Sequence, residues 1–345
     1  MPDRTRRRRT GRPDIDRSIE ELLNAAGAQS NRDQLFEILA TTIRMASNGA
    51  DRLDLKITNA AVKEMAEAFA VFAPYRSIPK LTMFGSARTR TDDPLYAQAR
   101  QLAASLAREG WMLVTGAGPG IMAAGLEGAG PDQAFGINIR LPFEDAPNAF
   151  ISGDPKLVEM KYFFTRKLML LKESDGYAVL PGGFGTMDEA FELLTLLQTG
   201  KAEPSPLVFV DVPGGSYWQA WERFVTDQLN ARGLISPDDS ALYCITDDVS
   251  CAAAEVLGFY RRYHSLRVVG DLSVIRLRTA PSDAQLAALN RDFADICVGG
   301  DIHRTEATPQ ERAGRDHVEL PRIALQFDRA HYGRLRQLID ALNRD

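Results

Sequence analysis

Three glycine-rich stretches of the chain have the composition of segments that bind an anion. They are GSAR at 85–88, GAGPG at 116–120 and PGGFGT at 181–186, and each follows a short apolar run. Glycine lets the backbone approach a ligand and direct several N–H groups at one anion, and a helix that starts just afterwards adds its positive end. One such turn is weak evidence, but three together favour binding of a phosphate or a nucleotide over a purely structural role.

The glycine spacing differs from two widespread nucleotide-binding motifs. A dinucleotide-binding turn requires G-x-G-x-x-G and, about 20 residues later, an acidic residue at the end of the next strand. Residues 116–120 read G-x-G-x-G, and the next apolar run, 134–139, is followed by Arg140. A P-loop requires a glycine followed by Lys and Ser or Thr, which the glycine-rich stretches lack. Neither motif therefore describes this chain.

Two basic residues, Arg166 and Lys167, interrupt an otherwise apolar stretch between residues 162 and 171. On one interpretation, both side chains only extend along the apolar surface to reach water. On the other, the guanidinium points toward the ends of the strands, where it could bind a sugar hydroxyl or a phosphate through two hydrogen bonds. The residues alone leave both interpretations open.

Glu189 allows a structural and a chemical interpretation. Thr186 and Glu189 have the T-x-x-E spacing of a capping box, in which the glutamate only caps the start of a helix. The same carboxylate could instead act in catalysis. A Glu189→Gln substitution separates the two roles, because a cap tolerates glutamine and a catalytic carboxylate does not.

Short apolar runs that alternate with helical patterns predict a doubly wound, Rossmann-like parallel α/β sheet. Strands that are apolar on both faces and joined by helices are typical of a parallel sheet covered on both sides. In such a sheet ligands bind beyond the carboxyl ends of the strands, where the glycine-rich stretches lie. The predicted strands are 80–84, 111–115, 134–139, 176–180, 206–211 and 241–245, and the predicted helices are 94–109, 120–129, 155–173, 186–199, 216–231 and 247–262.

Two further segments flank this predicted sheet. Apolar residues recur at helical spacing before it, in 33–46 and 57–72, and Pro74 ends this helical region. After it we expect a small α+β appendage with strands 268–277 and 320–327, helices 282–296 and 330–343, and a loop or weak hairpin at 299–319. The predicted domains are a basic disordered tail at 1–13, a helical extension at 14–76, a nucleotide-binding catalytic domain at 77–264 and an α+β domain at 265–345.

Charge and composition exclude several classes of protein. The 345 residues carry a net charge of −5, although residues 1–12 alone contain six Arg and one Asp. An acidic body is a poor partner for nucleic acid, and the basic run is expected to be a solvated, disordered start. Three cysteines without a CxxC pair, no apolar run long enough to span a bilayer and no secretory signal predict a cytoplasmic protein without a membrane partner.

The stretch PGGFGTMDE at 181–189 resembles the PGGxGTxxE signature of the LONELY GUY family of nucleoside 5′-monophosphate phosphoribohydrolases, often labelled lysine decarboxylase-like. The resemblance extends over roughly residues 78–262. It includes GSAR at 85–88, TGAGPGIM at 115–122, NIRLPFEDAPN at 138–148 and Arg166-Lys167. In place of the plant-type MHxRK, residues 162–167 read YFFTRK, which is similar to the longer bacterial branch and leaves the preferred base open.

The resemblance implies hydrolysis of the N-glycosidic bond of AMP or a cytokinin riboside monophosphate, giving a free base and ribose 5-phosphate. It implies that Arg166 and Glu189 form the catalytic pair, with Arg166 holding Glu189 ionised. It also points to a homo-oligomer of at least two subunits, and the chemistry requires no metal or redox cofactor. Predicted contacts to the nucleotide and its phosphate are Ser86, Arg88, Gly116, Gly118, Gly120, Lys167, Gly182, Gly183, Gly185 and Thr186.

Two other functions remain as alternatives. A nucleotide-binding regulatory protein could use the same loops without turnover, and release of free base by the purified protein separates it from a hydrolase. A pyridoxal phosphate decarboxylase would need a Schiff-base lysine in a phosphate-lined pocket, and the sequence has no recognisable setting for one. Cys297, His303 and His317 lack the spacing of a zinc site, so we expect no bound metal.

Overall fold

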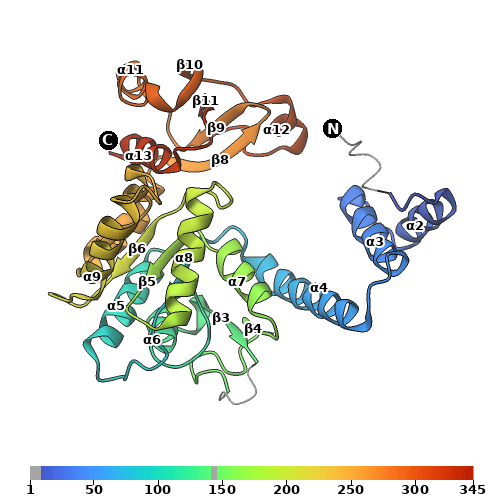
Figure 1. The fold of residues 1–345 in the computed structure, drawn as a ribbon, viewed down its shortest axis with the longest axis horizontal. Coiled ribbons are helices and arrows are strands. Elements are labelled where there is room, and N and C mark those ends of the chain that lie inside the picture. Colours follow the sequence, from blue (N-terminus) through green and yellow to red (C-terminus); the bar gives the residue numbers. More distant parts are fainter. Residues whose placement is uncertain (1–8, 141–145, 345) are drawn as a thin grey trace. The chain divides into compact units, whose positions relative to one another are not determined.

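The computed structural model describes residues 9–140 and 146–344, which divide into two compact units between Lys63 and Glu64 (Figure 1). Part of the predicted basic tail, residues 1–8, lies outside the described residues, as do residues 141–145 of the NIRLPFEDAPN stretch. Among the described residues, no helix is long and apolar enough to cross a membrane.

The first unit consists of helices, as the apolar spacing predicts. It contains α2 (Pro13–Ala25), α3 (Arg32–Ser47) and the first part of α4 (Arg52–Phe72). Ile19 of α2 packs with Phe36 of α3 in a small core. The last residues of the predicted tail are ordered: the Thr10 hydroxyl donates a hydrogen bond of 2.6 Å to Asp16, just after the start of α2.

A seven-stranded sheet forms the centre of the second unit and confirms the predicted doubly wound α/β fold. All its strand pairs are parallel, and their order is β4-β3-β2-β1-β5-β6-β7. The direction of winding reverses between β1 and β5, so the loops after these two strands diverge and open a crevice. The strands are β1 (Lys80–Phe84), β2 (Met112–Thr115), β3 (Ala134–Ile139), β4 (Leu157–Met160), β5 (Gly176–Val179), β6 (Leu207–Val210) and β7 (Cys244–Thr246).

Strand β4 corrects one predicted element. Residues 155–173 were expected to form one helix, but Leu157–Met160 pairs with β3, and the helix begins only at Phe163. Val158 and Met160 are buried while the residues beside them are half-exposed, as at the edge of a sheet. Four residues are too few for this alternation to stand out against the helical pattern that follows.

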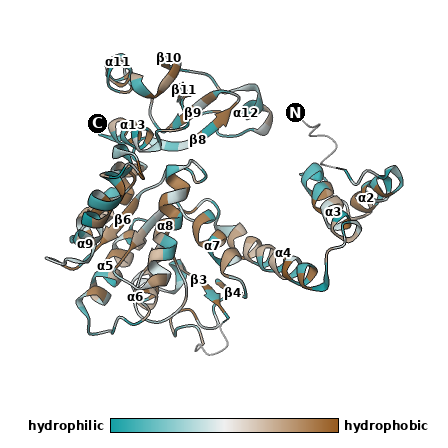
Figure 2. Cartoon of the chain, in the orientation of Figure 1, coloured by the Kyte–Doolittle hydropathy of each residue, from teal (hydrophilic) through white to brown (hydrophobic). Residues whose placement is uncertain are grey.

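Helices cover both faces of the sheet and create two separate cores. One face packs on α5 (Pro94–Arg108), α6 (Ile121–Ala129) and α10 (Val249–Phe259). The other packs on the end of α4 and on α7 (Phe163–Lys172), α8 (Phe184–Gln198) and α9 (Tyr217–Phe224). Figure 2 shows hydrophobic residues concentrated in the sheet and on the helix sides next to it. Short helical segments complete this part: η1 (Ala73–Tyr75), η2 (Pro131–Gln133), η3 (Val225–Asn230) and η4 (Pro237–Leu242).

The C-terminal part forms a four-stranded antiparallel sheet, in the order β10-β11-β9-β8, with a core of its own. The predicted strand 268–277 is in fact a hairpin that turns at Gly270, whose φ is +62°. The predicted loop 299–319 contains most of a strand and a short helix that starts with a capping box from Thr308 to Glu311. The elements are β8 (Tyr263–Val269), β9 (Leu272–Leu277), α11 (Asp283–Asp292), η5 (Ala294–Ile296), β10 (Cys297–Arg304), α12 (Pro309–Gly314), β11 (Arg322–Phe327) and α13 (Tyr332–Asn343). The domain boundaries after residues 13, 76 and 264 stay predictions.

Candidate active site

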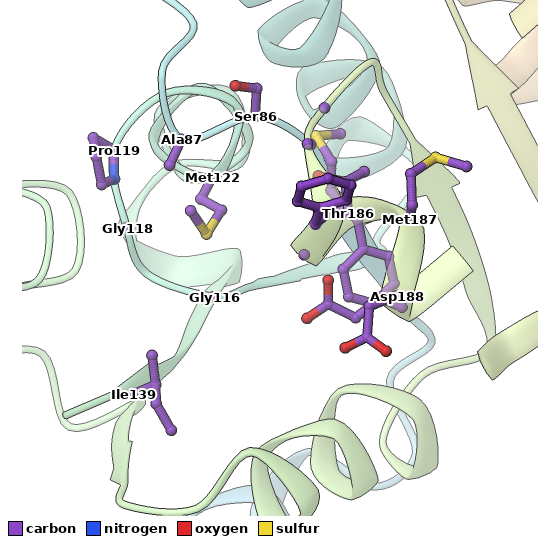
Figure 3. A pocket seen from close by; sticks show the side chains of 18 of the residues that line it. Ser86, Ala87, Gly116, Gly118, Pro119, Met122, Ile139, Thr186, Met187 and Asp188 are labelled. Atoms are coloured by element: carbon purple, nitrogen blue, oxygen red, sulfur yellow. The ribbon is translucent and has the colours of Figure 1, made fainter. Parts of the chain in front are cut away.

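A cavity of about 950 Å³ lies at the carboxyl ends of the central strands, where the sheet reverses its winding. Figure 3 shows Ser86 and Pro119 on one side of it and Thr186, Met187 and Asp188 on the other. The structure brings together ten of the twelve predicted site residues in its walls. These are Ser86, Arg88, Gly116, Gly118, Arg166, Gly182, Gly183, Gly185, Thr186 and Glu189. The other two predicted residues, Gly120 and Lys167, do not line it.

Gly120 has a structural role in the loop after β2. Its φ is +66°, and a Cβ at this position would lie 2.3 Å from the backbone oxygen of Ser86. Glycine here lets the loops after β1 and β2 pack together, and Ile121 N–H donates a hydrogen bond of 3.0 Å to the same Ser86 oxygen. Asn148 supports the loop from the other side through Nδ2, which donates to the carbonyl oxygens of Ala117 and Gly118 at 2.9 and 2.8 Å.

The PGGFGT loop leads directly into α8, which begins at Phe184 with Gly183 as its N-cap. The positive end of this helix therefore lies at the cavity wall, where it favours an anion. Tyr217, the first residue of α9, donates a hydrogen bond of 2.6 Å from its hydroxyl to the Gly182 carbonyl oxygen and also lines the cavity. The sequence carries no signal for Tyr217, because it follows a different strand and belongs to no recognisable motif.

The start of α8 decides between the two interpretations of Glu189. Because Gly183 is the N-cap, Thr186 is the third residue of the helix and Glu189 the sixth, and the helix start has no side-chain cap. A capping box requires the threonine at the N-cap position. Glu189 is therefore not a cap, and its half-buried side chain lines the cavity instead.

The carboxyl group of Glu189 has an unusual protonation equilibrium. Burial raises its pKa to about 7, although the positive charges of Arg166 and Lys167 oppose this, while the charges of Asp188 and Glu192 add to it. The guanidinium of Arg166 thus favours the ionised form of Glu189, but desolvation outweighs it. A carboxyl that gains and loses a proton near neutral pH is typical of catalytic sites.

The guanidinium of Arg166 bridges the ends of two strands. Its Nε donates a hydrogen bond of 2.9 Å to the Ile137 carbonyl oxygen of β3, and its Nη2 donates one of 3.2 Å to the Gly116 carbonyl oxygen just after β2. A Cβ at Gly116 would lie 2.0 Å from that Nη2, so the glycine makes room for the guanidinium. Arg166 therefore does not simply extend to water, and its side chain lines the same cavity as Glu189.

Comparison with known proteins finds related sequences over the segment that contains this site. A family model described as possible lysine decarboxylase matches residues 120–256, which include Arg166 and Glu189. A cytokinin riboside 5′-monophosphate phosphoribohydrolase of Mycobacterium tuberculosis is 28% identical over 172 residues, covering 48% of this chain and 87% of that protein. The probable cytokinin riboside 5′-monophosphate phosphoribohydrolase LOGL3 of Oryza sativa is 36% identical over 72 residues, covering 21% of this chain and 32% of that protein. These matches support the resemblance to the LONELY GUY family.

Among solved structures, the molybdenum cofactor carrier protein of Chlamydomonas reinhardtii is 20% identical, with a TM-score of 0.37. That alignment covers 52% of this chain and 96% of that protein. In the chain described here, residues 9–140 and 146–344 hold no group of three His, Cys, Asp or Glu side chains placed to bind a metal ion.

Lys167 is not among the residues that line this cavity. Its ammonium forms ion pairs with Asp188 at 2.6 Å and with Glu192 at 2.8 Å. The side chain is 16% exposed and lines a neighbouring, more open pocket between α7 and α8. Its position therefore does not support the predicted contact with a bound phosphate. The ammonium of Lys167 instead pairs with the acidic side chains on either side of Glu189 in the sequence.

Proposed function

We propose that this protein is a nucleoside 5′-monophosphate phosphoribohydrolase that acts on AMP or a cytokinin riboside monophosphate. The observation that carries the proposal is the carboxyl of Glu189, with its pKa raised to about 7, in one cavity with the Arg166 guanidinium and three glycine-rich loops. The similarity to the Mycobacterium tuberculosis phosphoribohydrolase supports the same reaction.

The chemistry requires a negative charge close to the ribose. As the bond between C1′ and the base nitrogen breaks, the bonding pair leaves with the base and positive charge develops on the sugar. An ionised Glu189 stabilises that charge and accepts a proton from the water whose oxygen bonds to C1′. The base leaves with a proton, so one water is consumed for each ribose 5-phosphate formed. Arg166 binds the sugar or the phosphate and holds it in register with Glu189.

We assign the phosphate to the glycine-rich walls. Gly183 and Gly185 lie at the start of α8, and a Cβ added at either glycine would have no described atom within 4 Å. This open space beside the helix start leaves room for an anion. Binding energy from this remote group positions C1′ against Glu189 and so contributes to turnover rather than to affinity alone.

The 5′-phosphate should therefore be required. We expect kcat/KM for AMP to exceed that for adenosine by at least about a hundredfold, because adenosine forgoes the remote binding energy that orients C1′. A panel of nucleoside monophosphates and their nucleosides, with chromatographic detection of released base, measures this ratio and identifies the preferred base.

A mock purification from cells that do not express the protein is the blank for contaminating hydrolases. Equal efficiency on nucleotide and nucleoside would contradict the phosphate assignment. Nucleotide binding without release of any base, across the whole panel, would instead identify the protein as a nucleotide-binding regulator.

The rate should also rise with pH through neutrality. Because burial raises the pKa of Glu189 to about 7, the ionised fraction increases as the pH rises from 6.5 to 8, and kcat/KM should increase about fourfold with it. The substrate phosphate titrates near pH 6 and overlaps the lower end of this range. The residual rate of Glu189→Gln, which retains only the phosphate titration, is the control, and a flat profile for the wild type would contradict the assignment.

Assembly into at least a dimer stays a prediction. Exposed aromatic side chains on α7 and α8, including Phe164 at 54% and Phe191 at 38% exposure, would be covered in such an assembly. The cytoplasmic location and the absence of a nucleic-acid partner likewise stay predictions from composition.

A further inference from the structure

One ammonium group holds two of the three acidic side chains at the start of α8. Asp188 precedes Glu189 directly, and Glu192 follows it by three residues, which is almost one helical turn. Lys167 reaches across from α7 and pairs with both, at 2.6 Å and 2.8 Å. Glu189, which lies between them in sequence, lines the cavity and has no ion pair with Lys167 within 4 Å.

This arrangement differs from an ordinary surface ion pair. An exposed ion pair contributes little to the free energy of unfolding, because water screens the charges and the long side chains lose conformational freedom. Here the Lys167 side chain is only 16% exposed and meets two carboxylates. Burial opposes its charged form, but the interactions with Asp188 and Glu192 together outweigh this and raise the pKa of the ammonium. The ammonium therefore keeps its positive charge where α7 meets α8.

The pairing also fixes how the two helices meet. Arg166 and Lys167 are neighbours on α7, while Asp188 and Glu189 are neighbours on α8. Within each pair of neighbours, one residue belongs to the proposed catalytic pair and the other takes part in the ion pairs beside it. A shift of α7 along α8 would break the ion pairs and move Arg166 relative to Glu189.

We propose that Lys167 is a positioning residue for Glu189, whose ammonium neutralises Asp188 and Glu192 and locks α7 onto α8 so that Arg166 and Glu189 meet in one cavity. The proposal rests on the proposed function only in taking Glu189 as the catalytic carboxylate. It replaces the predicted role of Lys167 as a phosphate ligand.

The charged groups around Glu189 come from two helices. Arg166 and Lys167 on α7 favour its ionised form, and Asp188 and Glu192 on α8 itself disfavour it. A further polar contact of α8 lies at its far end, where Gln198 donates a hydrogen bond of 2.5 Å to Asp239 of η4. Nine residues of helix, about 13 Å, separate Gln198 from Glu189, so this contact does not set the charge of the carboxyl.

The first test is Lys167→Met, which removes the positive charge of Lys167 and keeps an unbranched apolar side chain in its place. In Lys167→Met the carboxylates of Asp188 and Glu192 lose their counterion, so Glu189 should become harder to ionise. We expect the rising limb of kcat/KM against pH to move up by about one pH unit, and the rate at pH 7 to fall severalfold. Lys167→Arg keeps the charge and should restore most of the wild-type profile.

Lys172→Met is the matched control. Lys172 lies on the same helix and also forms an ion pair, with Glu173 at 2.6 Å, but its side chain is half-exposed and is not among the charges acting on Glu189. Its loss should leave the pH profile in place. A profile that moves equally in Lys172→Met and Lys167→Met would show a general effect of lost charge and overturn the proposal.

A second readout does not depend on turnover. The carboxyl carbon of Glu189 can be titrated by NMR in ¹³C-glutamate-labelled protein and identified by the signal that disappears in Glu189→Gln. Its midpoint should move up in Lys167→Met and stay in place in Lys172→Met. If the wild type releases no base and yet this midpoint moves, the hydrolase proposal fails and the role of Lys167 stands; an unmoved midpoint overturns that role.

A folding defect in Lys167→Met would not end the test. The double variant Asp188→Asn/Glu192→Gln removes both acids and keeps the ammonium, so the Glu189 midpoint and the limb of the rate profile should move down. Absence of any movement in this double variant would overturn the proposal.

Discussion

Glu189→Gln should lower the turnover of a nucleoside monophosphate by at least about a hundredfold and leave the protein folded. The substitution keeps the size of the side chain but removes the negative charge that a cationic ribose requires, and loss of one such electrostatic contact costs about 3 kcal/mol of activation free energy. Release of base under saturating substrate, measured against the wild type at pH 8, gives the ratio directly.

Thermal melting at two pH values separates catalysis from stability in this variant. Because burial raises the pKa of Glu189 from 4.5 to about 7, ionising it costs folding free energy as the pH rises through that range. Neutral glutamine avoids the cost, so Glu189→Gln should melt at or above the wild-type temperature at pH 8, and the advantage should shrink at pH 5. A variant with near-native turnover would remove the proposed mechanism, and a lower melting temperature at pH 8 would show that the carboxylate is structurally required.

Arg166→Lys should reduce turnover by about a hundredfold, again without unfolding the protein. The guanidinium donates to carbonyl oxygens on two strand ends at once, at 2.9 Å and 3.2 Å, while an ammonium on a flexible stem cannot reproduce this planar geometry. The positive charge is retained, so a large loss would identify the geometry of the guanidinium as the important property. Near-native kcat/KM in Arg166→Lys would show that a positive charge alone is sufficient.

Gly116→Ala tests whether the position of the Arg166 guanidinium matters, without changing Arg166 itself. The new methyl group would lie 2.0 Å from Nη2 of Arg166 and 2.7 Å from the sulfur of Met122, and both are ends of flexible side chains that can move. The protein should therefore fold with a displaced guanidinium and a reduced rate. Gly258→Ala in α10, where no described atom lies within 4 Å of the new methyl group, is the control and should keep the wild-type rate. An unchanged rate in Gly116→Ala would contradict the requirement for the position of Arg166.

The pattern of short apolar runs along the sequence was sufficient to predict the parallel sheet and to place the site at the carboxyl ends of its strands. Runs such as 80–84 and 176–180 are buried on both faces, so their apolar residues are continuous and bounded by glycine turns, and the structure confirms a parallel sheet there. Strand β4 could not be predicted, because four residues at a sheet edge carry little periodic signal and the pairing with β3 is a contact between distant parts of the chain. The hairpin at Gly270 was missed because its two strands read as one continuous run.

The sequence by itself determined which chemical groups stand near the cavity: glycines at the ends of three strands, a guanidinium in an apolar helix and a carboxylate shortly after the PGGFGT loop. Only the tertiary structure decided what each group does. In the folded protein α8 begins at Phe184, which excludes capping by Glu189. Burial raises the pKa of the Glu189 carboxyl to about 7. Lys167 forms ion pairs with Asp188 and Glu192. The reason is physical: residue type and spacing act along the chain, whereas desolvation, ion pairing and the direction of a side chain depend on neighbours that the fold brings from elsewhere.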